Sequence, residues 1–165
     1  MGARAMALLA LAVAAGAADL LHGRIGNAIT YPAIVSGLVL GGAESGWLGA
    51  GASALGIAAA LAAGLPLFMW GGMGGGDVKL YVAVGALAGP RGLLDVALGS
   101  LVLGAGAAVV MLAWRGELWR SLWSVAVFFA TAVTPRVRVV APRGGPRLRF
   151  GVCIALAALG LAWSG

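Results

Sequence analysis

Long apolar runs, separated by short polar or glycine-rich turns, make up most of the chain. At about 20 apolar residues per bilayer-spanning helix, a chain of this length has room for six or seven spans. The runs predict helices at about residues 4–21, 28–42, 47–70, 78–89, 92–114 and 149–164. The pattern therefore predicts an all-α, polytopic membrane protein with about six transmembrane helices, built as a single membrane-embedded domain over residues 1–165.

The segment 118–134 is ambiguous, because it is apolar enough to cross a membrane but short, and Glu117 and Arg120 lie at its start. If it does not cross, nearly all arginines fall on one side of the membrane, and only Arg4 and Arg91 fall on the other. Basic loops remain in the cytoplasm. The arginines therefore predict that both termini lie outside and that 118–134 is interfacial or re-entrant.

Composition supports a membrane protein, since 62% of the residues are hydrophobic and 10% are charged. A soluble domain has about 25% charged residues. The net charge of +6 does not indicate a nucleic-acid partner, because the basic residues lie mainly between apolar runs. Cys153 is the only cysteine and His22 the only histidine, so neither an intrachain disulfide nor a Cys/His metal cluster can form. We expect no metal and no cofactor.

Glycine is abundant, with 29 residues in the chain. Gly37 and Gly41 form a four-residue pair, as do Gly85 and Gly89, and such pairs allow close helix approach in lipid. We expect these pairs to be packing surfaces, without any indication of a particular oligomer.

Two carboxylates, Asp19 and Asp77, are predicted to lie at the same depth. Asp19 lies 15 residues after Arg4, and Asp77 lies 14 residues before Arg91. At about 1.5 Å per residue, both come to roughly 21–22 Å below the outer surface of a core about 30 Å thick. An acid inside the membrane is costly and indicates function by default. The structural alternative is that each acid only marks a helix end in a watery interface.

The residues before Asp77 strengthen the functional interpretation. The run Gly71-Gly72-Met73-Gly74-Gly75-Gly76 cannot form a stable helix but can bring backbone close to a ligand. At membrane depth such a loop must line a wet cavity. A phosphate-binding loop is disfavoured, because the GxxxxGK[ST] pattern is absent. Two carboxylates that share a proton can instead activate water and protonate a peptide carbonyl, which is aspartic-protease chemistry.

Two motifs surround these aspartates in the chain. They read Gly74-Gly75-Gly76-Asp77-Val78-Lys79-Leu80, and Asp19 followed by Arg24-Ile25-Gly26-Asn27-Ala28-Ile29-Thr30. With both motifs, the chain resembles the type IV prepilin peptidases, membrane aspartic proteases of the GxGD class, and in particular the short form of tight-adherence pilus systems. Arg149-Phe150-Gly151 stands where that family often has Pro-Tyr-Gly.

The resemblance implies that Asp19 and Asp77 are the catalytic pair and that Gly74, Gly76 and Asn27 belong to the active-site loops. It implies a prepilin or pseudopilin substrate, held in the lipid bilayer of the bacterial inner membrane, whose short basic leader is removed at the cytoplasmic face. Longer family members carry a methyltransferase loop with two CxxC pairs, which this chain cannot have, so only peptidase activity is expected. Gly26 replaces the proline usual before Asn27.

Other functions remain open on the residues alone. A small cation channel or transporter would use the glycine run as a filter and the two acids as a cation site. A non-enzymatic scaffold of a pilus assembly machine would not need an acid behind a glycine loop. Another GxGD protease, of the presenilin kind, would have Tyr-Asp where this chain has Ala18-Asp19. For Lys79, a side chain that extends to the inner head groups is favoured over one that meets a substrate carboxylate.

Overall fold

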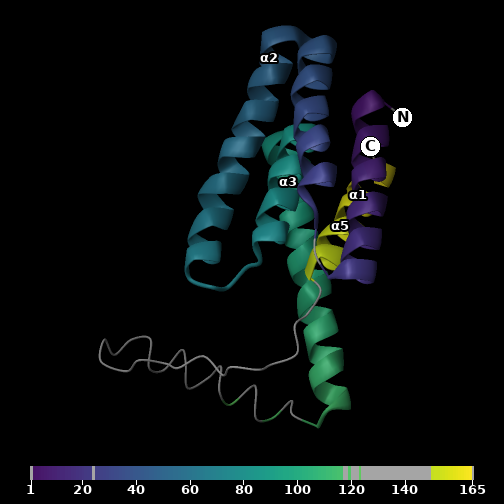
Figure 1. Cartoon of the computed structure of the whole chain (residues 1–165), viewed down its shortest axis with the longest axis vertical. Helices are drawn as coiled ribbons and strands as arrows, with labels where there is room; N and C mark the ends of the chain where they lie inside the picture. Colours follow the sequence, from purple (N-terminus) through teal and green to yellow (C-terminus); the bar gives the residue numbers. More distant parts are fainter. Residues whose placement is uncertain (1, 24, 117–118, 120–122, 124–149, 165) are drawn as a thin grey trace. The chain divides into compact units, whose positions relative to one another are not determined.

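The computed structural model describes residues 2–23, 25–116, 119, 123 and 150–164. Within these ranges the chain forms four helices and no strand: α1 (Ala3–His22), α2 (Asn27–Met69), α3 (Gly75–Trp114) and α5 (Phe150–Ser164) (Figure 1). The helices α1, α2 and α3 are each long and apolar enough to cross a membrane, and α5 is a shorter apolar helix. The all-α prediction is confirmed for the described residues.

Within its described residues, the structure shows four helices where six were predicted, because two of the expected turns are breaks inside a helix. The expected helices 28–42 and 47–70 are parts of α2, which loses helical geometry at Ser45 and Gly46. The expected helices 78–89 and 92–114 are likewise parts of α3, which is interrupted at Gly89. Gly46 and Gly89 have φ angles of 56° and 70°, a conformation that glycine adopts without steric cost. Each break is therefore made without a longer loop.

Each break turns its helix back on itself. In α2, the Ser53 hydroxyl donates a 3.1 Å hydrogen bond to the carbonyl oxygen of Gly37, although a straight helix would hold these residues about 24 Å apart. Figure 1 shows the two arms of α2 joined at the top of the view. In α3, the hydroxyls of Tyr81 and Ser100 are 2.5 Å apart, across a stretch that would span about 28 Å if straight. Both helices are therefore hairpins of two packed arms.

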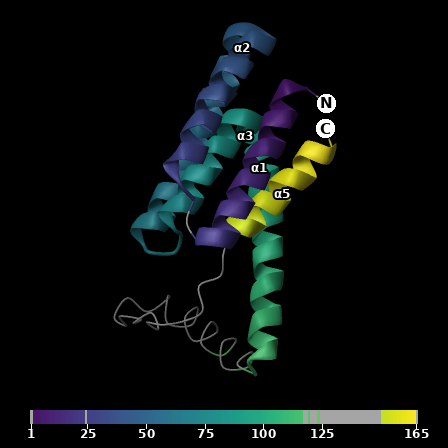
Figure 2. The ribbon, with the colours of Figure 1, turned by 45° about the vertical axis from the view of Figure 1, so that its right-hand side comes forward.

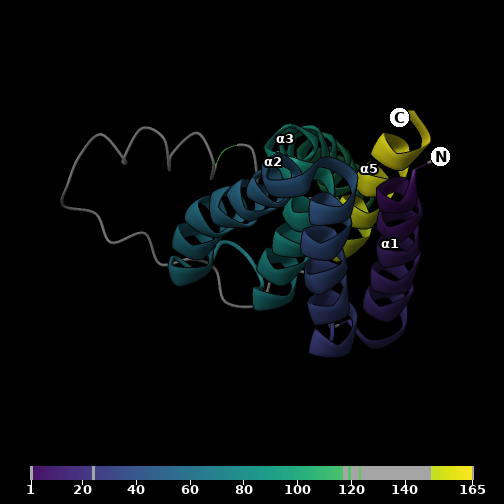
Figure 3. The same cartoon turned by 90° about the horizontal axis from the view of Figure 1, so that it is seen from above.

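The first and last helices pack against each other. Figures 1 and 2 show α1 and α5 side by side, and Figure 3 shows the two chain ends close together. A methyl group added to Gly16 of α1 would lie 3.3 Å from the Cβ of Ala155, and the side chain of Asp19 meets the backbone of Val152. Because contacts later in α1 fall earlier in α5, the two helices run antiparallel. Leu8, Leu11 and Ile154 are among the buried side chains that they contribute to the core.

The arms of α2 and α3 meet through their backbones. A Cβ on Gly56 would lie 2.0 Å from the carbonyl oxygen of Gly85, and one on Gly37 would lie 2.6 Å from the carbonyl carbon of Ala86. Within α2, a Cβ on Gly49 would lie 2.0 Å from the oxygen of Gly41. Three of the four glycines predicted as packing positions therefore do pack. Gly89 differs, because it forms the break in α3 and a Cβ there would lie 3.8 Å from the carbonyl oxygen of Ala52.

The chain divides into two compact units, one of residues 1–103 with 149–165 and one of residues 104–148. The candidate site lies within the first unit. The predicted interfacial or re-entrant segment 118–134 lies outside the described residues, apart from Trp119 and Trp123. That prediction and the single-domain prediction both stay predictions.

The contact between Gly56 and Gly85 makes a prediction about stability. Gly56→Ala should lower the free energy of unfolding by about 1–3 kcal/mol, because the added methyl group meets backbone that cannot move aside cheaply. Gly51→Ala is the matched control in the same helix, since nothing lies within 4 Å of a Cβ there. Thermal unfolding in detergent should show a lower Tm for Gly56→Ala than for Gly51→Ala. Equal values would mean that the two backbones do not touch.

Candidate active site

Asp19 lies in the last turn of α1, and the residue is 7% exposed. The backbone N–H of Gly23 donates to the carbonyl oxygen of Asp19 at 2.9 Å, and Gly23 has a φ of 63°. This left-handed glycine ends the helix and turns the chain towards Ile25 and the start of α2. The helix end thus fixes the backbone of Asp19, while the side chain points into the protein.

The first turn of α5 meets the Asp19 carboxylate. The backbone N–H of Val152 donates a hydrogen bond of 3.1 Å to Oδ2 of Asp19. A methyl group on the neighbouring Gly151 would lie 2.8 Å from the same oxygen and 2.9 Å from Cδ1 of Ile25. The carboxylate therefore lies directly on the backbone at the amino end of α5.

Asp77 lies in the first turn of α3, which begins at Gly75. The expectation that the whole glycine run from Gly71 to Gly76 stays outside the helix is wrong for its last two residues. The N–H groups of Asp77 and Val78 both reach the carbonyl oxygen of Gly74, at 3.1 and 3.2 Å, and this closes the first turn. The Asp77 side chain turns back towards this loop, because a Cβ on Gly74 would lie 3.1 Å from its Oδ2.

The structure brings Asp19 and Asp77 into one neighbourhood around Ile25. Ile25 packs beside both helix starts, since its Cβ would lie 3.5 Å from a Cβ on Gly76 and its Cδ1 lies beside Gly151. Cys153 is partly exposed and directly follows Val152, whose N–H contacts Asp19. The site is therefore the meeting point of the end of α1 and the starts of α3 and α5.

Asn27 is linked to this neighbourhood through Lys79. The Lys79 ammonium donates a hydrogen bond of 2.8 Å to Oδ1 of Asn27, which joins the first residue of α2 to the first turns of α3. The two side chains lie at the protein surface. This pairing was not predicted from the sequence. The partners expected for Lys79 were the inner head groups or a substrate carboxylate.

Among the described residues, no three histidine, cysteine, aspartate or glutamate side chains are grouped so that they could hold a metal ion. His22, at the end of α1, is exposed. The expectation that the chain uses no metal and no cofactor stays a prediction.

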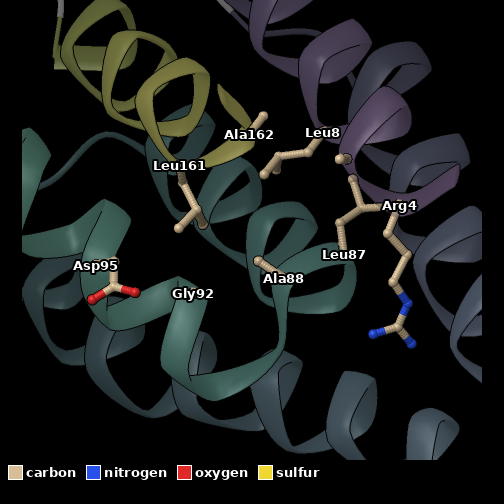
Figure 4. Close-up of a pocket in the computed structure, with 9 residues that line it drawn as sticks. Arg4, Leu8, Leu87, Ala88, Gly92, Asp95, Leu161 and Ala162 are labelled. Carbon is tan, nitrogen blue, oxygen red and sulfur yellow. The ribbon is translucent and has the colours of Figure 1, made fainter. Parts of the chain in front are cut away.

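A cavity of about 300 Å³ lies at the other end of α1 (Figure 4). Figure 4 shows Arg4 and Asp95 on opposite sides of it, with apolar side chains such as Leu8 and Leu87 between them. Arg4 and Asp19 are separated by about 22 Å along the helix. Arg4 also pairs with Glu44 at 3.1 Å, so that the start of α1 is tied to the break in α2. This cavity is no part of the site around the aspartates.

The family model of the type IV leader peptidases matches residues 6–109. The chain belongs to the type IV leader peptidase family. Comparisons with curated proteins and with solved structures give no match. Membership makes the chain a peptidase, and together with its apolar helices it indicates a membrane protein.

The part that matches this leader peptidase family contains Asp19, Asn27 and the Gly74–Asp77 motif, but it ends before α5. Gly151 and Val152 are the residues at the site to which the sequence reasoning assigned no role. The available signal was Phe150-Gly151, which stands where related peptidases often have Tyr-Gly before the last helix. That signal marks a position without revealing that it touches Asp19.

The position of Cys153 predicts that a group attached to its thiol blocks the peptidase. N-ethylmaleimide should abolish most leader cleavage, because the adduct adds bulk one residue after the Val152 N–H that contacts Asp19. Cys153→Ala should cleave like the unmodified protein and should resist the reagent. The measurement is prepilin cleavage on a gel, together with the mass of the intact protein to quantify labelling. Complete labelling without loss of cleavage would place the thiol away from the site.

Proposed function

We propose that this peptidase removes the short basic leader of type IV prepilins or pseudopilins, with Asp19 and Asp77 as its catalytic dyad. The observation that carries the proposal is that these two aspartates, from the ends of different helices, lie at one meeting point. Asp19 accepts a hydrogen bond from the first turn of α5, and Ile25 packs both beside that turn and beside Gly76, the residue before Asp77. Two carboxylates that lie close together share one proton readily, because both cannot be ionised without cost. A pair of this kind is the acid and base of a metal-independent peptidase.

In this mechanism the ionised carboxylate takes a proton from water as the water oxygen attacks the carbonyl carbon of the scissile peptide bond. The protonated carboxyl group gives its proton to the carbonyl oxygen. In the second step, the carboxyl group that took the proton from water gives it to the leaving nitrogen, and the C–N bond breaks. The other carboxylate takes a proton from one hydroxyl of the intermediate. The dyad returns to its starting state, and one water has been consumed.

The glycine loop before Asp77 supports a peptide substrate. Gly71, Gly72 and Gly74 are exposed, so an extended peptide backbone can approach them closely without side chains in the way. The start of α3 then presents Asp77 to the bond that lies across the loop. In this proposal the leader remains on the cytoplasmic side, and the apolar helix of the prepilin stays in the lipid bilayer.

The proposal places the chain in the bacterial inner membrane as a multi-pass protein with six crossings and both termini outside. The arms of α2, residues 27–44 and 47–69, are about 27 and 35 Å long, which is enough to cross a core of about 30 Å. The first arm of α3, residues 75–88, is about 21 Å long. An arm of this length starts below the inner surface, so Asp77 lies within the membrane near its cytoplasmic face.

The dyad predicts that Asp19→Asn and Asp77→Asn each abolish prepilin cleavage while the protein still inserts. An amide at either position removes the division between acid and base. Each variant is co-expressed with a prepilin whose basic leader ends in glycine, and leader removal is measured on a gel. The matched control is Asp95→Asn, an exposed aspartate of α3 at the cavity away from the site. Substantial cleavage by either dyad variant would refute the mechanism.

The topology predicts which side of the membrane each turn faces. In a Cys153→Ala background, Ser45→Cys should react with a membrane-impermeant maleimide in cells whose outer membrane has been permeabilised. Gly72→Cys should react only after the inner membrane is broken, because its loop faces the cytoplasm. The opposite pattern would contradict a dyad at the cytoplasmic face.

A further inference from the structure

The first turn of α5 lies outside the part of the chain that matches the leader peptidase family, yet it contacts Asp19. The Val152 N–H donates to Oδ2 of Asp19 at 3.1 Å. A Cβ on Gly151 would come within 2.8 Å of that oxygen and within 3.0 Å of Cγ. Two consecutive residues of α5 therefore lie against the same carboxylate. Val152 donates a hydrogen bond to it, and Gly151 leaves the space that it occupies, because glycine has no side chain.

We propose that Gly151 and Val152 are positioning residues that set where the Asp19 carboxylate lies relative to Asp77. Val152 holds Oδ2 through its backbone N–H, and Gly151 provides the space that the carboxylate occupies. This inference rests on the proposed function, because it assigns to α5 the placement of one member of the dyad.

Electrostatics explains why the Asp19 carboxylate lies at the start of α5. The N–H groups of a helix's first turn have no partner within the helix, and the helix dipole makes that end positive. Asp19 lies in the last turn of α1, where the dipole of its own helix disfavours a negative charge. The antiparallel packing of α1 and α5 brings a positive helix end to the carboxylate. Such a charge-assisted hydrogen bond fixes direction as well as distance.

The atoms around Gly151 predict that a substitution there affects the position of the Asp19 carboxylate more than the stability of the fold. The three atoms nearest to a methyl group there all belong to the side chains of Asp19 and Ile25, and none belongs to backbone. The cheapest relief is therefore a displacement of the Asp19 carboxylate by several tenths of an ångström, with the helices left in place. A misplacement of about 1 Å in a catalytic group can cost on the order of 100-fold in rate. The fold should accommodate the change better than the reaction does.

The test is Gly151→Ala, assayed as purified full-length protein in liposomes on a full-length prepilin whose basic leader ends in glycine. We expect kcat to fall by about 10- to 100-fold and KM to stay within about twofold, because the substrate's own contacts are unchanged. Gly160→Ala is the matched control in α5, since no atom lies within 4 Å of its added Cβ. Gly16→Ala is the control for packing, because its Cβ meets Ala155 at 3.3 Å without touching the carboxylate. Both controls should retain kcat.

A double variant separates Asp19 from the second neighbour of Gly151. Ile25→Val deletes the Cδ1 atom that a Cβ on Gly151 would meet at 2.9 Å, but it leaves the collision with Asp19. Gly151→Ala combined with Ile25→Val should therefore keep the low kcat of Gly151→Ala, after division by the effect of Ile25→Val alone. Recovery of kcat in the double variant would overturn the inference, because the loss would then have come through Ile25.

Val152→Pro tests the donor separately and keeps the inference falsifiable if Gly151→Ala does not fold. Proline is accepted in the first turn of a helix, and Gly151 has no Cβ for the ring to meet. Without the N–H, kcat should fall at least about tenfold with KM again nearly unchanged. Wild-type kcat in both Gly151→Ala and Val152→Pro would refute the inference while Asp19→Asn stays inactive. Cleavage by Asp19→Asn would instead refute the proposed function itself.

Discussion

Contact between helix backbones is the constraint on which the rest of this structure depends. In lipid, apolar side chains gain little by leaving one apolar environment for another, so helices associate through close van der Waals packing. Gly56 and Gly85 allow this, because any side chain at either position would overlap the opposite backbone. Large side chains such as Leu48 and Val102 remain on the outside of the helices. The hairpins of α2 and α3 are therefore joined through glycine contacts. These contacts set the positions of the helix ends.

The site follows from where helices end. An ionisable group in an apolar bundle is stabilised only if donors or charges are supplied to it. Asp77 lies in the first turn of its own helix, α3, and Asp19 accepts a hydrogen bond from the first turn of α5. Both carboxylates thus lie at amino ends, although only one of them belongs to the helix that begins there. Ile25 fills the space beside both starts and excludes solvent from this side.

Much of this fold could be predicted from apolar runs, because burial in lipid depends on composition. The limits of α1 and α5 lie within about one residue of the predicted ones. The places of the joints in α2 and α3 were predicted, but not how short the joints are, because a hydropathy pattern does not distinguish a loop from a one-glycine break such as Gly89. The meeting of Asp19 with Asp77 was predicted from equal depth, whereas the role of Gly151 depends on a contact between residues 132 positions apart. No local pattern contains such a contact.

The hydrogen bond between Val152 and Asp19 also links the site to the order in which the chain is synthesised. Both carboxylates and the glycine loop emerge from the ribosome within the first half of the chain, whereas the donor belongs to the final helix. A nascent chain that has inserted α1, α2 and α3 contains both aspartates of the proposed dyad but not the backbone of α5 that contacts Asp19. With Asp19 and Asp77 as the proposed dyad, proteolytic competence would be acquired only when α5 packs against α1. A chain that has not yet inserted α5 would hold both carboxylates without the hydrogen bond that orients Asp19.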